Sequence, residues 1–344
     1  LGARGYDTRI WTARMPEKSK LVRYDGKLAP YITKQNLKEY EVIDPDRFDD
    51  LDLKEREASY GRSGFALQFM LDTTLSDKER YPLKLSDLIV MDINNDIAPV
   101  KVAWAGSPEY ACEDLPSVGF TGDKYYKPMF KSEDFGEYKG SVMAIDPAGR
   151  GQDELGVAIV KQLGGNLFVQ SCMGLSGGYT ESNLTKIATM ARDAKVNMII
   201  VESNFGDGMF TQLLKPIVQR YYPVTIDEVH HTKQKELRII DTLEPVMNQH
   251  RLVVSPQLIR EDFDTKDPNY QLFYQMTRLT KDRGSIRNDD RLDVLAIAVA
   301  YWVEQMATDS EKEMLTHRDN LLEADLEKFL EGTLGTKPKG NMWI

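Results

Sequence analysis

The sequence predicts a mixed α/β fold in which three antiparallel strands are followed by parallel strands, with helices on both faces of the sheet. Short apolar runs at 141–146, 156–162 and 167–173, separated by glycine-rich turns, predict the antiparallel strands. After residue 180, segments with helical apolar spacing alternate with continuous apolar runs, which are typical of strands buried on both faces of a parallel sheet.

The elements after the third strand follow in a regular order. A helix from about 180 to 194, capped by Thr180, precedes an apolar strand at 197–202. Because crossovers between parallel strands are right-handed in about 98% of cases, we expect this fourth strand to return beside the first. Asp146 and Glu202, at the carboxyl ends of these strands, would then be about 5 Å apart. The remaining predictions are a helix at 206–220, a strand at 224–229, a helix at 235–250 and a long helix at 290–305.

The chain of 344 residues is longer than one ordinary domain of about 100–200 residues. In its first part, Arg9–Ala13 alternates like a strand, 51–62 resembles a charged helix ending near Gly61, and 64–71 resembles a buried helix. The next part has little periodicity and is rich in Pro, Gly, Asp and Tyr, as in a connector. We therefore predict parts at 1–90, 91–138, 139–307 and 308–344.

Charge and composition restrict the functional class. Lys and Arg number 44 and Asp and Glu 54, a net charge of −10, which argues against a chain coated in nucleic acid but allows a local basic surface. No apolar run approaches the roughly 18–20 residues of a bilayer crossing, so we expect a soluble protein without a membrane partner. Two cysteines and no signal-peptide pattern indicate a reducing cytosol, and the missing initiator Met suggests a piece of a longer chain.

Acidic residues end two apolar strands and open the last helix. Asp146 and Glu202 follow the strands, and Asp290 and Asp293 share one face of a helix that is otherwise apolar nearly all round. A buried carboxylate without a partner is costly, so Asp293 in particular indicates a bound cation, whereas Asp289 or Asp290 alone could be a helix cap. Oxygen ligands suit Mg²⁺ or Mn²⁺, and two ions about 3.5–4 Å apart assist phosphodiester hydrolysis.

Three motifs together resemble the nuclease motifs of tailed-phage terminase large subunits, most closely the T7-like type. They are Val-Met-Ala-Ile-Asp-Pro-Ala-Gly-Arg-Gly at 142–151, Ile-Ile-Val-Glu-Ser-Asn at 199–204 and Asn-Asp-Asp-Arg-Leu-Asp-Val-Leu-Ala at 288–296. The resemblance covers roughly residues 60–305. It implies a ribonuclease-H-like fold, two divalent ions (Mg²⁺ or Mn²⁺) and endonucleolytic cleavage of concatemeric double-stranded DNA during viral genome packaging.

The resemblance also implies roles for the acids. Asp146 would bridge both ions, Glu202 would hold one, and Asp290 and Asp293 would supply the rest, with Asp146, Glu202 and Asp293 as the catalytic set. Asp293 is favoured over Asp290 because it lies deeper in the apolar helix, and Asp289 ranks third.

Terminases of this kind carry an N-terminal packaging ATPase. The chain contains no Gly-x-x-x-x-Gly-Lys-Ser/Thr motif, and Gly26-Lys27 is not a remnant of one because Leu21 and Leu28 occupy the key positions. We therefore expect residues 1–90 to be the end of the ATPase domain. ATP hydrolysis is expected of the full-length protein and not of this fragment.

Two basic groups are candidates for contact with the DNA backbone. One is expected as a hairpin leading into the acidic helix, and the other follows the fifth strand; a solvated surface loop is the alternative for the first. The paired histidines of the second group suggest zinc only faintly, since no further ligand has the required spacing. The first group is Arg278, Lys281, Arg283, Arg287 and Arg291; the second is His230, His231, Lys233, Lys235 and Arg238.

The tail is predicted to be an acidic amphipathic helix at 310–331 followed by a short end, 336–344, that is too rich in Gly and Pro to fold alone. Its Trp343-Ile344 terminus could contact a portal or procapsid, or pack on its own domain. The resemblance further implies a small terminase subunit as partner, a homo-oligomer on the capsid, and a location in the bacterial host cytoplasm at the procapsid vertex during packaging.

Two other functions remain compatible with these residues. A junction resolvase or another ribonuclease-H-like nuclease would share the metal chemistry without an ATPase remnant. In a non-catalytic module for motor assembly, the acids would be structural.

Overall fold

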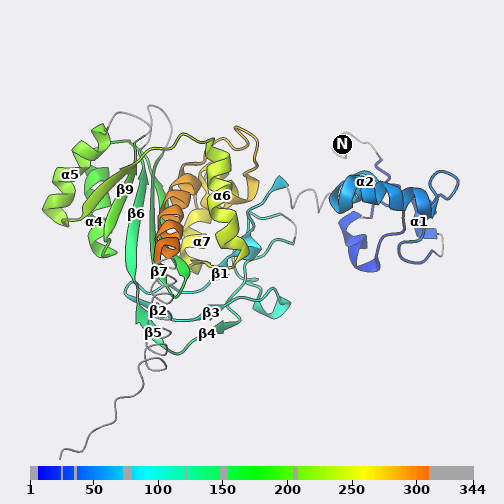
Figure 1. Cartoon of the computed structure of the whole chain (residues 1–344), viewed down its shortest axis with the longest axis horizontal. Helices are drawn as coiled ribbons and strands as arrows, with labels where there is room; N and C mark the ends of the chain where they lie inside the picture. Colours follow the sequence, from blue (N-terminus) through cyan, green and yellow to red (C-terminus); the bar gives the residue numbers. More distant parts are fainter. Residues whose placement is uncertain are drawn as a thin grey trace, which may run out of the picture. The chain divides into compact units, whose positions relative to one another are not determined.

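A computed structural model of the protein describes residues 7–24, 26–34, 37–72, 80–120, 122–147, 154–203 and 208–309. The chain divides into two compact units, Leu1–Pro82 and Leu83–Ile344 (Figure 1). Leu85, Leu88 and Val90 are buried in the core of the second unit, and for that reason the division falls between Pro82 and Leu83 rather than at residue 90.

The first unit is built around a small apolar core. Its elements are a 3₁₀ helix Lys18–Tyr24, helix α1 (Pro30–Lys34) and helix α2 (Asp50–Gln68). The Asp49 side chain caps α2 by accepting a hydrogen bond from the Asp52 N–H. The core consists of Tyr24, Leu28, Ala29, Ile32 and Ile43.

Two predictions for this unit were wrong. The helices expected at 51–62 and 64–71 form the single helix α2, because a glycine inside a helix costs only about 1 kcal/mol relative to alanine and does not end it. The strand expected at Arg9–Ala13 is reduced to one isolated bridge between Ile10 and Leu28, so a short alternating run without a full partner strand does not form a ladder.

The second unit contains a seven-stranded sheet in the order β1-β11-β8-β7-β6-β9-β10. The strands β6, β7 and β8 are antiparallel neighbours, and β9 returns parallel to β6 as the crossover rule predicts. The mixed α/β prediction is therefore confirmed. The strands are β1 (Ile89–Val90), β6 (Gly140–Asp146), β7 (Leu155–Leu163), β8 (Asn166–Leu175), β9 (Met198–Glu202), β10 (Thr225–Val229) and β11 (Leu252–Val254).

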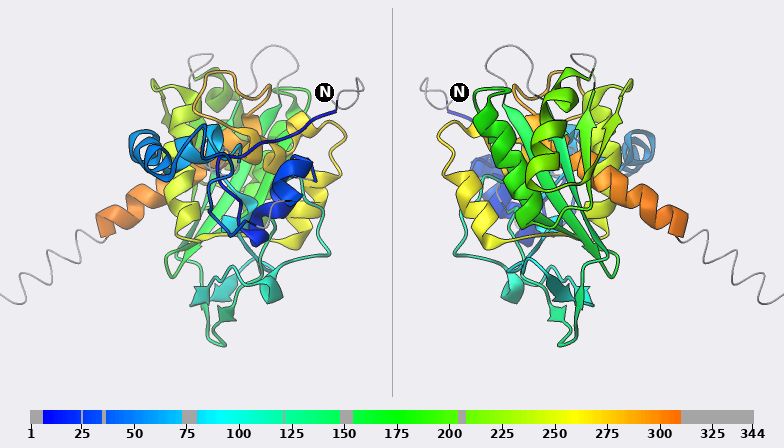
Figure 2. Two further views of the ribbon diagram at one scale, coloured as in Figure 1. Left: turned by 90° about the vertical axis from the view of Figure 1, so that its right-hand side faces the viewer. Right: turned by 90° about the vertical axis from the view of Figure 1, so that its left-hand side faces the viewer.

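Helices cover both faces of this sheet (Figures 1 and 2). Alternate residues of β6 explain the two layers, since Met143 and Ile145 pack with α4 and α5 while Val142 and Ala144 pack with α6 and the 290–309 helix. The helices are α4 (Glu181–Asp193), α5 (Met209–Tyr221), α6 (Lys235–Asn248), α7 (Pro256–Phe263), α8 (Leu272–Arg278) and residues 290–309.

The segment 91–138, expected as an irregular connector, belongs to the second unit and forms two small antiparallel sheets. Strand β2 (Ile97–Pro99) pairs with β5 (Phe135–Glu137), and β3 (Val102–Ala103) pairs with β4 (Phe130–Lys131). Ala98 joins a core cluster with Phe168 and Val253 of the main sheet. Short 3₁₀ helices lie at Leu85–Asp87, Pro108–Tyr110 and Pro268–Tyr270.

Gly156 allows the 290–309 helix to approach the sheet closely. This glycine of β7 pairs with Asp146 at the end of β6. A Cβ atom at Gly156 would lie 2.8 Å from the carbonyl oxygen of Asp290, so a larger residue would force the helix away. The first turn of the helix is thereby brought beside the ends of β6 and β9.

Some predicted features lie outside the described residues. These are the turn at 149–151, Asn204, the helix at 310–331 and the end of the tail. Across the ranges given above, no helix combines the length and the apolar character that a membrane crossing requires.

Candidate metal centre

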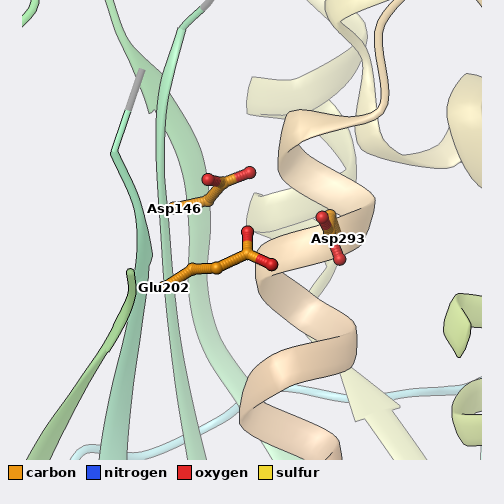
Figure 3. A group of neighbouring side chains, drawn as sticks. All are labelled: Asp146, Glu202 and Asp293. Atoms are coloured by element: carbon orange, nitrogen blue, oxygen red, sulfur yellow. The ribbon is translucent and has the colours of Figure 1, made fainter. Parts of the chain in front are cut away.

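Three carboxylates from distant parts of the chain converge at one edge of the sheet (Figure 3). Asp146 ends β6 and Glu202 ends β9; these strands are parallel neighbours, so both side chains emerge at the same edge. Asp293 faces them from the first turn of the 290–309 helix. One oxygen atom of each residue lies within 4.8 Å of the others. The expected meeting of strand-end acids with a helix acid is therefore present.

These carboxylates are largely withdrawn from solvent. Asp293 is fully buried, Glu202 is 6% exposed, and the Asp146 side chain is 17% exposed. Within the cluster, Asp293 Oδ1 is buried and accepts no hydrogen bond, although it lies 2.7 Å from Nη2 of Arg238. Three carboxylates buried beside one another repel each other unless positive charge lies among them, so the cluster suits a cation.

Two basic side chains from the first turn of α6 enter the same cluster. Lys235 Nζ lies 2.8 Å from Asp289 Oδ1, 3.0 Å from Asp293 Oδ2 and 3.8 Å from Asp146 Oδ2. Three residues later on the same helix face, Arg238 Nη2 lies 3.3 Å from Glu202 Oε1. The sequence prediction that this basic group contacts DNA phosphates missed the pairing. The i, i+3 spacing shows that Lys235 and Arg238 share a helix face but not which acids they contact.

His231 contacts the cluster from the segment before α6. Its Nδ1 atom lies 3.1 Å from Glu202 Oε1. Among the described residues, the three carboxylates are spaced as potential metal ligands, and His231 is not part of that group. The histidine therefore orients a carboxylate, and the faint zinc interpretation receives no support.

Burial and neighbouring charges shift the pKa values of the acids in different directions. Burial raises the pKa of Asp146 to about 8; the charge of Lys235 opposes this, and the charges of Asp293 and Glu202 add to it. Burial also acts to raise the pKa of Glu202, but the hydrogen bond with His231 and the charge of Arg238 outweigh it, so this pKa is lowered. Glu202 is consequently the more readily ionised of the two strand-end acids.

The remaining members of the cluster respond to the same forces. Burial raises the pKa of Asp293 despite the opposing charges of Lys235 and Arg238. For Lys235, burial acts to lower the pKa, but the charges of Asp293, Asp289 and Asp146 prevail and raise it, so the ammonium stays protonated. The donor set is thus entirely carboxylate oxygen with acids in excess of bases, which fits a hard divalent cation.

The other two acids of the helix start occupy different positions. Asp289 is paired with Lys235. Asp290 Oδ2 accepts a hydrogen bond of 3.4 Å from the backbone N–H of Glu154, and its charge contributes to the raised pKa of Asp146. The group with metal-ligand spacing therefore contains Asp293 and neither of its two acidic predecessors.

The segment 279–289 is a loop packed against the start of α6. It contains turns and bends without strand pairing, so the expected basic hairpin was wrong in its secondary structure. Gln234 donates a hydrogen bond of 3.0 Å to the Lys281 carbonyl, and the Gly284 N–H donates one of 2.6 Å to Glu236. The exposed side chains of Lys281, Arg283, Arg287 and Lys233 consequently belong to two adjacent segments beside the acidic cluster.

Two arginines of the predicted basic group have structural partners instead. Arg278 donates to the Val118 carbonyl at 3.2 Å and stacks over the Phe120 ring, 3.9 Å from its centroid. Arg291 is 7% exposed and forms ion pairs with Glu154 and Asp262. A count of basic residues along the sequence could not separate these from the exposed ones, because the partners lie more than 20 residues away.

The fold and the cluster together define a class. The sheet of three antiparallel strands followed by parallel strands is a ribonuclease-H-like fold, and it carries carboxylates at the ends of two neighbouring strands and on a packed helix. Residues 145–252 match the family described as "Terminase Bacteriophage T7, Ribonuclease H-like domain".

The chain is similar to the large terminase subunit of Enterobacteria phage T3, with 39% identity over 341 residues, which is 95% of this chain. The resemblance to tailed-phage terminase large subunits is thus confirmed. The chain spans 58% of the length of that relative.

Solved terminase nuclease domains are also similar in structure. The Mn-soaked, inhibitor-bound human cytomegalovirus terminase nuclease domain matches 47% of this chain and 82% of its own, with a TM-score of 0.37 and 17% identity. The large terminase nuclease of thermophilic phage G20c matches 64% of this chain and 98% of its own, with a TM-score of 0.36 and 11% identity.

Proposed function

We propose that this chain is a metal-dependent endonuclease that cleaves concatemeric double-stranded DNA during viral genome packaging. The observation that carries the proposal is the convergence of Asp146, Glu202 and Asp293, with their oxygen atoms within 4.8 Å of one another, in a buried cluster at a sheet edge. Similarity to a phage terminase large subunit supports a role in genome packaging.

In this proposal the carboxylates hold two Mg²⁺ or Mn²⁺ ions. Asp146, Glu202 and Asp293 would be the residues that hold them, with Asp290 beside Asp293. Ions bound there supply Lewis-acid stabilisation of the charge that develops on the phosphate during in-line hydrolysis. His231 and Arg238 hold the Glu202 carboxylate in its orientation, and Lys235 balances the charge of Asp289 and Asp293.

Cleavage of DNA by the 344-residue chain tests this function. Supercoiled plasmid and linear duplex should both be cut in Mg²⁺ or Mn²⁺, and chelation of the ions should stop the reaction. A strong preference for four-way junctions over linear duplex would instead favour the resolvase alternative, and failure to cut any substrate would favour the assembly module.

The pKa of Asp146 predicts how stability depends on pH without divalent ions. The folded protein holds this proton more tightly than the unfolded chain, because the folded pKa is about 8 and the ordinary value is 3.8. The stabilising contribution is therefore complete at low pH and is lost as the pH rises from about 4 to about 8.

Comparison with Asp146→Asn isolates this group, since the amide does not titrate. Between pH 5 and 8, the free energy of unfolding of the native chain should fall relative to that of the variant by on the order of 1 kcal/mol per pH unit. Urea denaturation in chelator measures the difference. A difference that stays constant over this range would mean that Asp146 is already ionised in the folded protein.

We further propose that the exposed basic residues beside the cluster contact the phosphate backbone. Arg283→Glu combined with Arg287→Glu should weaken duplex binding and reduce the slope of log affinity against log salt by about 0.9 for each lost contact. Fluorescence anisotropy in Ca²⁺ over a range of salt concentrations measures the slope.

Arg192→Glu is the matched control, because Arg192 is exposed on α4, which covers the opposite face of the sheet. Its slope should equal that of the native chain. If the double variant also keeps the native slope, the 279–289 loop does not contact the backbone.

The remaining proposals concern the longer protein. Similarity to the T3 large subunit supports a small terminase subunit and a portal or procapsid as partners, a homo-oligomer on the capsid, and ATP hydrolysis by an N-terminal domain beyond this chain. We also propose that the full-length protein acts in the bacterial cytoplasm, at the procapsid vertex. The tail at 308–344 remains the proposed contact with the portal.

A further inference from the structure

The buried Arg291 connects the helix at 290–309, called the metal-centre helix below, to several neighbouring segments. Arg291 Nε and Nη2 donate to the two carboxylate oxygens of Glu154, at 3.1 and 3.4 Å. Its Nη1 atom donates to Asp262 Oδ1 at 3.1 Å and to Thr265 Oγ1 at 3.2 Å. All three nitrogen atoms of the guanidinium are therefore engaged, in the forked geometry that lysine cannot reproduce.

The partners of Arg291 are themselves fixed. Asp262, at the end of α7, accepts hydrogen bonds from the backbone N–H groups of Leu272 and Phe273, at 2.8 and 3.1 Å. Glu154 immediately precedes β7, whose Gly156 pairs with Asp146. Arg291 thus connects the start of the metal-centre helix to α7, to the start of α8 and to the strand beside Asp146.

Backbone contacts hold the same turn of the helix. The Cys172 thiol donates to the Arg291 carbonyl at 3.2 Å, and the Leu292 N–H donates to Gln275 Oε1 at 3.0 Å. With the close approach at Gly156, these contacts leave this turn little freedom to shift along or away from the sheet.

Helix geometry places Arg291 and Asp293 on nearly opposite sides. Successive residues are about 100° apart around a helix, so these two side chains point about 160° apart. The guanidinium therefore does not touch the acidic cluster. It restricts the rotation and translation of the helix from the side opposite the cluster. The position of the Asp293 carboxylate relative to Asp146 and Glu202 therefore depends on the contacts of Arg291.

We propose that Arg291 is a positioning residue for the metal centre, acting through its bridge between Glu154 and Asp262. The inference rests on the proposed function, because it assumes that Asp293 binds a divalent ion. Loss of the bridge should weaken ion binding while leaving contacts with the DNA backbone in place.

Binding of Mn²⁺ alone, followed by electron paramagnetic resonance on the 344-residue chain, tests the proposal. Arg291→Lys keeps the positive charge but cannot form the bidentate hydrogen bonds of the guanidinium. Glu154→Gln removes the negative charge of one partner and keeps almost the same size. Each should weaken Mn²⁺ binding by about tenfold, as the loss of groups that orient metal ligands typically does. Under cleavage conditions, the Mn²⁺ concentration for half-maximal rate should rise by the same factor, with the KM for DNA unchanged.

Controls separate positioning from general damage. Arg260→Lys changes an exposed ion pair of α7, whose Nη2 to Asp114 Oδ2 distance is 3.5 Å, and should leave Mn²⁺ binding unchanged. Circular dichroism and thermal denaturation establish that each variant is folded; if Arg291→Lys is not, Glu154→Gln decides the result.

Asp293→Asn distinguishes a failure of the positioning role of Arg291 from a failure of the proposed metal centre. If it removes Mn²⁺ binding while Glu154→Gln and Arg291→Lys bind as the native chain does, the positioning role is overturned and the proposed function stands. If Asp293→Asn also binds Mn²⁺ normally, the proposed metal centre fails, and the positioning role fails with it.

Discussion

Asp293→Asn is expected to reduce metal-dependent DNA cleavage by at least about a thousandfold, which corresponds to roughly 4 kcal/mol of activation free energy. The carboxylate is fully buried; among the described residues its Oδ1 atom accepts no hydrogen bond, although Nη2 of Arg238 lies 2.7 Å away. Asparagine keeps the size of the side chain but removes its charge, so it binds a hard divalent ion more weakly than the carboxylate does. Plasmid nicking in Mg²⁺ or Mn²⁺, at a substrate concentration well above KM, measures the loss.

Asp146→Asn and Glu202→Gln should produce losses of the same order, because each residue supplies one side of the same cluster. The fold should survive in all three variants. Burial disfavours the charged forms of Asp146 and Asp293, so their neutral amides are tolerated there, and glutamine keeps the size of Glu202. Asp241→Asn, at an exposed position of α6, is the matched control and should retain full activity. Activity within twofold of the native chain in Asp293→Asn would show that the acids are structural and would support the assembly module.

The central part of the fold could be predicted because it follows from patterns within single segments and from the handedness of crossover connections. Apolar runs bounded by glycine turns located β6, β7 and β8, and the handedness of crossovers placed β9 beside β6. Asp293 could be singled out because an acid in an otherwise apolar helix must face a charged partner. These arguments needed no knowledge of which distant segments touch.

Features that depend on contacts between distant segments could not be predicted. The pairing of Arg238 with Glu202 and Asp293 joins residues 36 and 55 positions apart, and neither end has a pattern that identifies the other. Arg278 and Arg291 resembled surface charges because their partners lie on other elements. Strand β11 has three residues and α8 has seven, so neither is long enough to show a clear apolar period.

Lys235→Met is expected to destabilise the protein in chelator and to increase the stabilisation that Mn²⁺ provides. The ammonium lies within 4 Å of oxygen atoms of Asp146, Asp289 and Asp293. Its removal leaves Arg238 as the remaining basic partner of Asp293. The expected cost is about 1–3 kcal/mol, below the usual 3–5 kcal/mol for a buried pair, because the Lys235 side chain is 36% exposed. Urea denaturation in chelator measures this loss, and Lys215→Met, at an exposed position of α5, is the control.

The metal-dependent part of this prediction follows from competition for the same oxygens. An ion bound by Asp146, Glu202 and Asp293 must share Asp293 with Lys235, so the native chain gains less from the ion than a chain without the ammonium. The increase in the free energy of unfolding on adding saturating Mn²⁺ should therefore be larger in Lys235→Met than in the native chain. If the increase in the free energy of unfolding is smaller in Lys235→Met than in the native chain, the lysine assists ion binding. Lys235 would then order the carboxylates and would not compete with the ion for them.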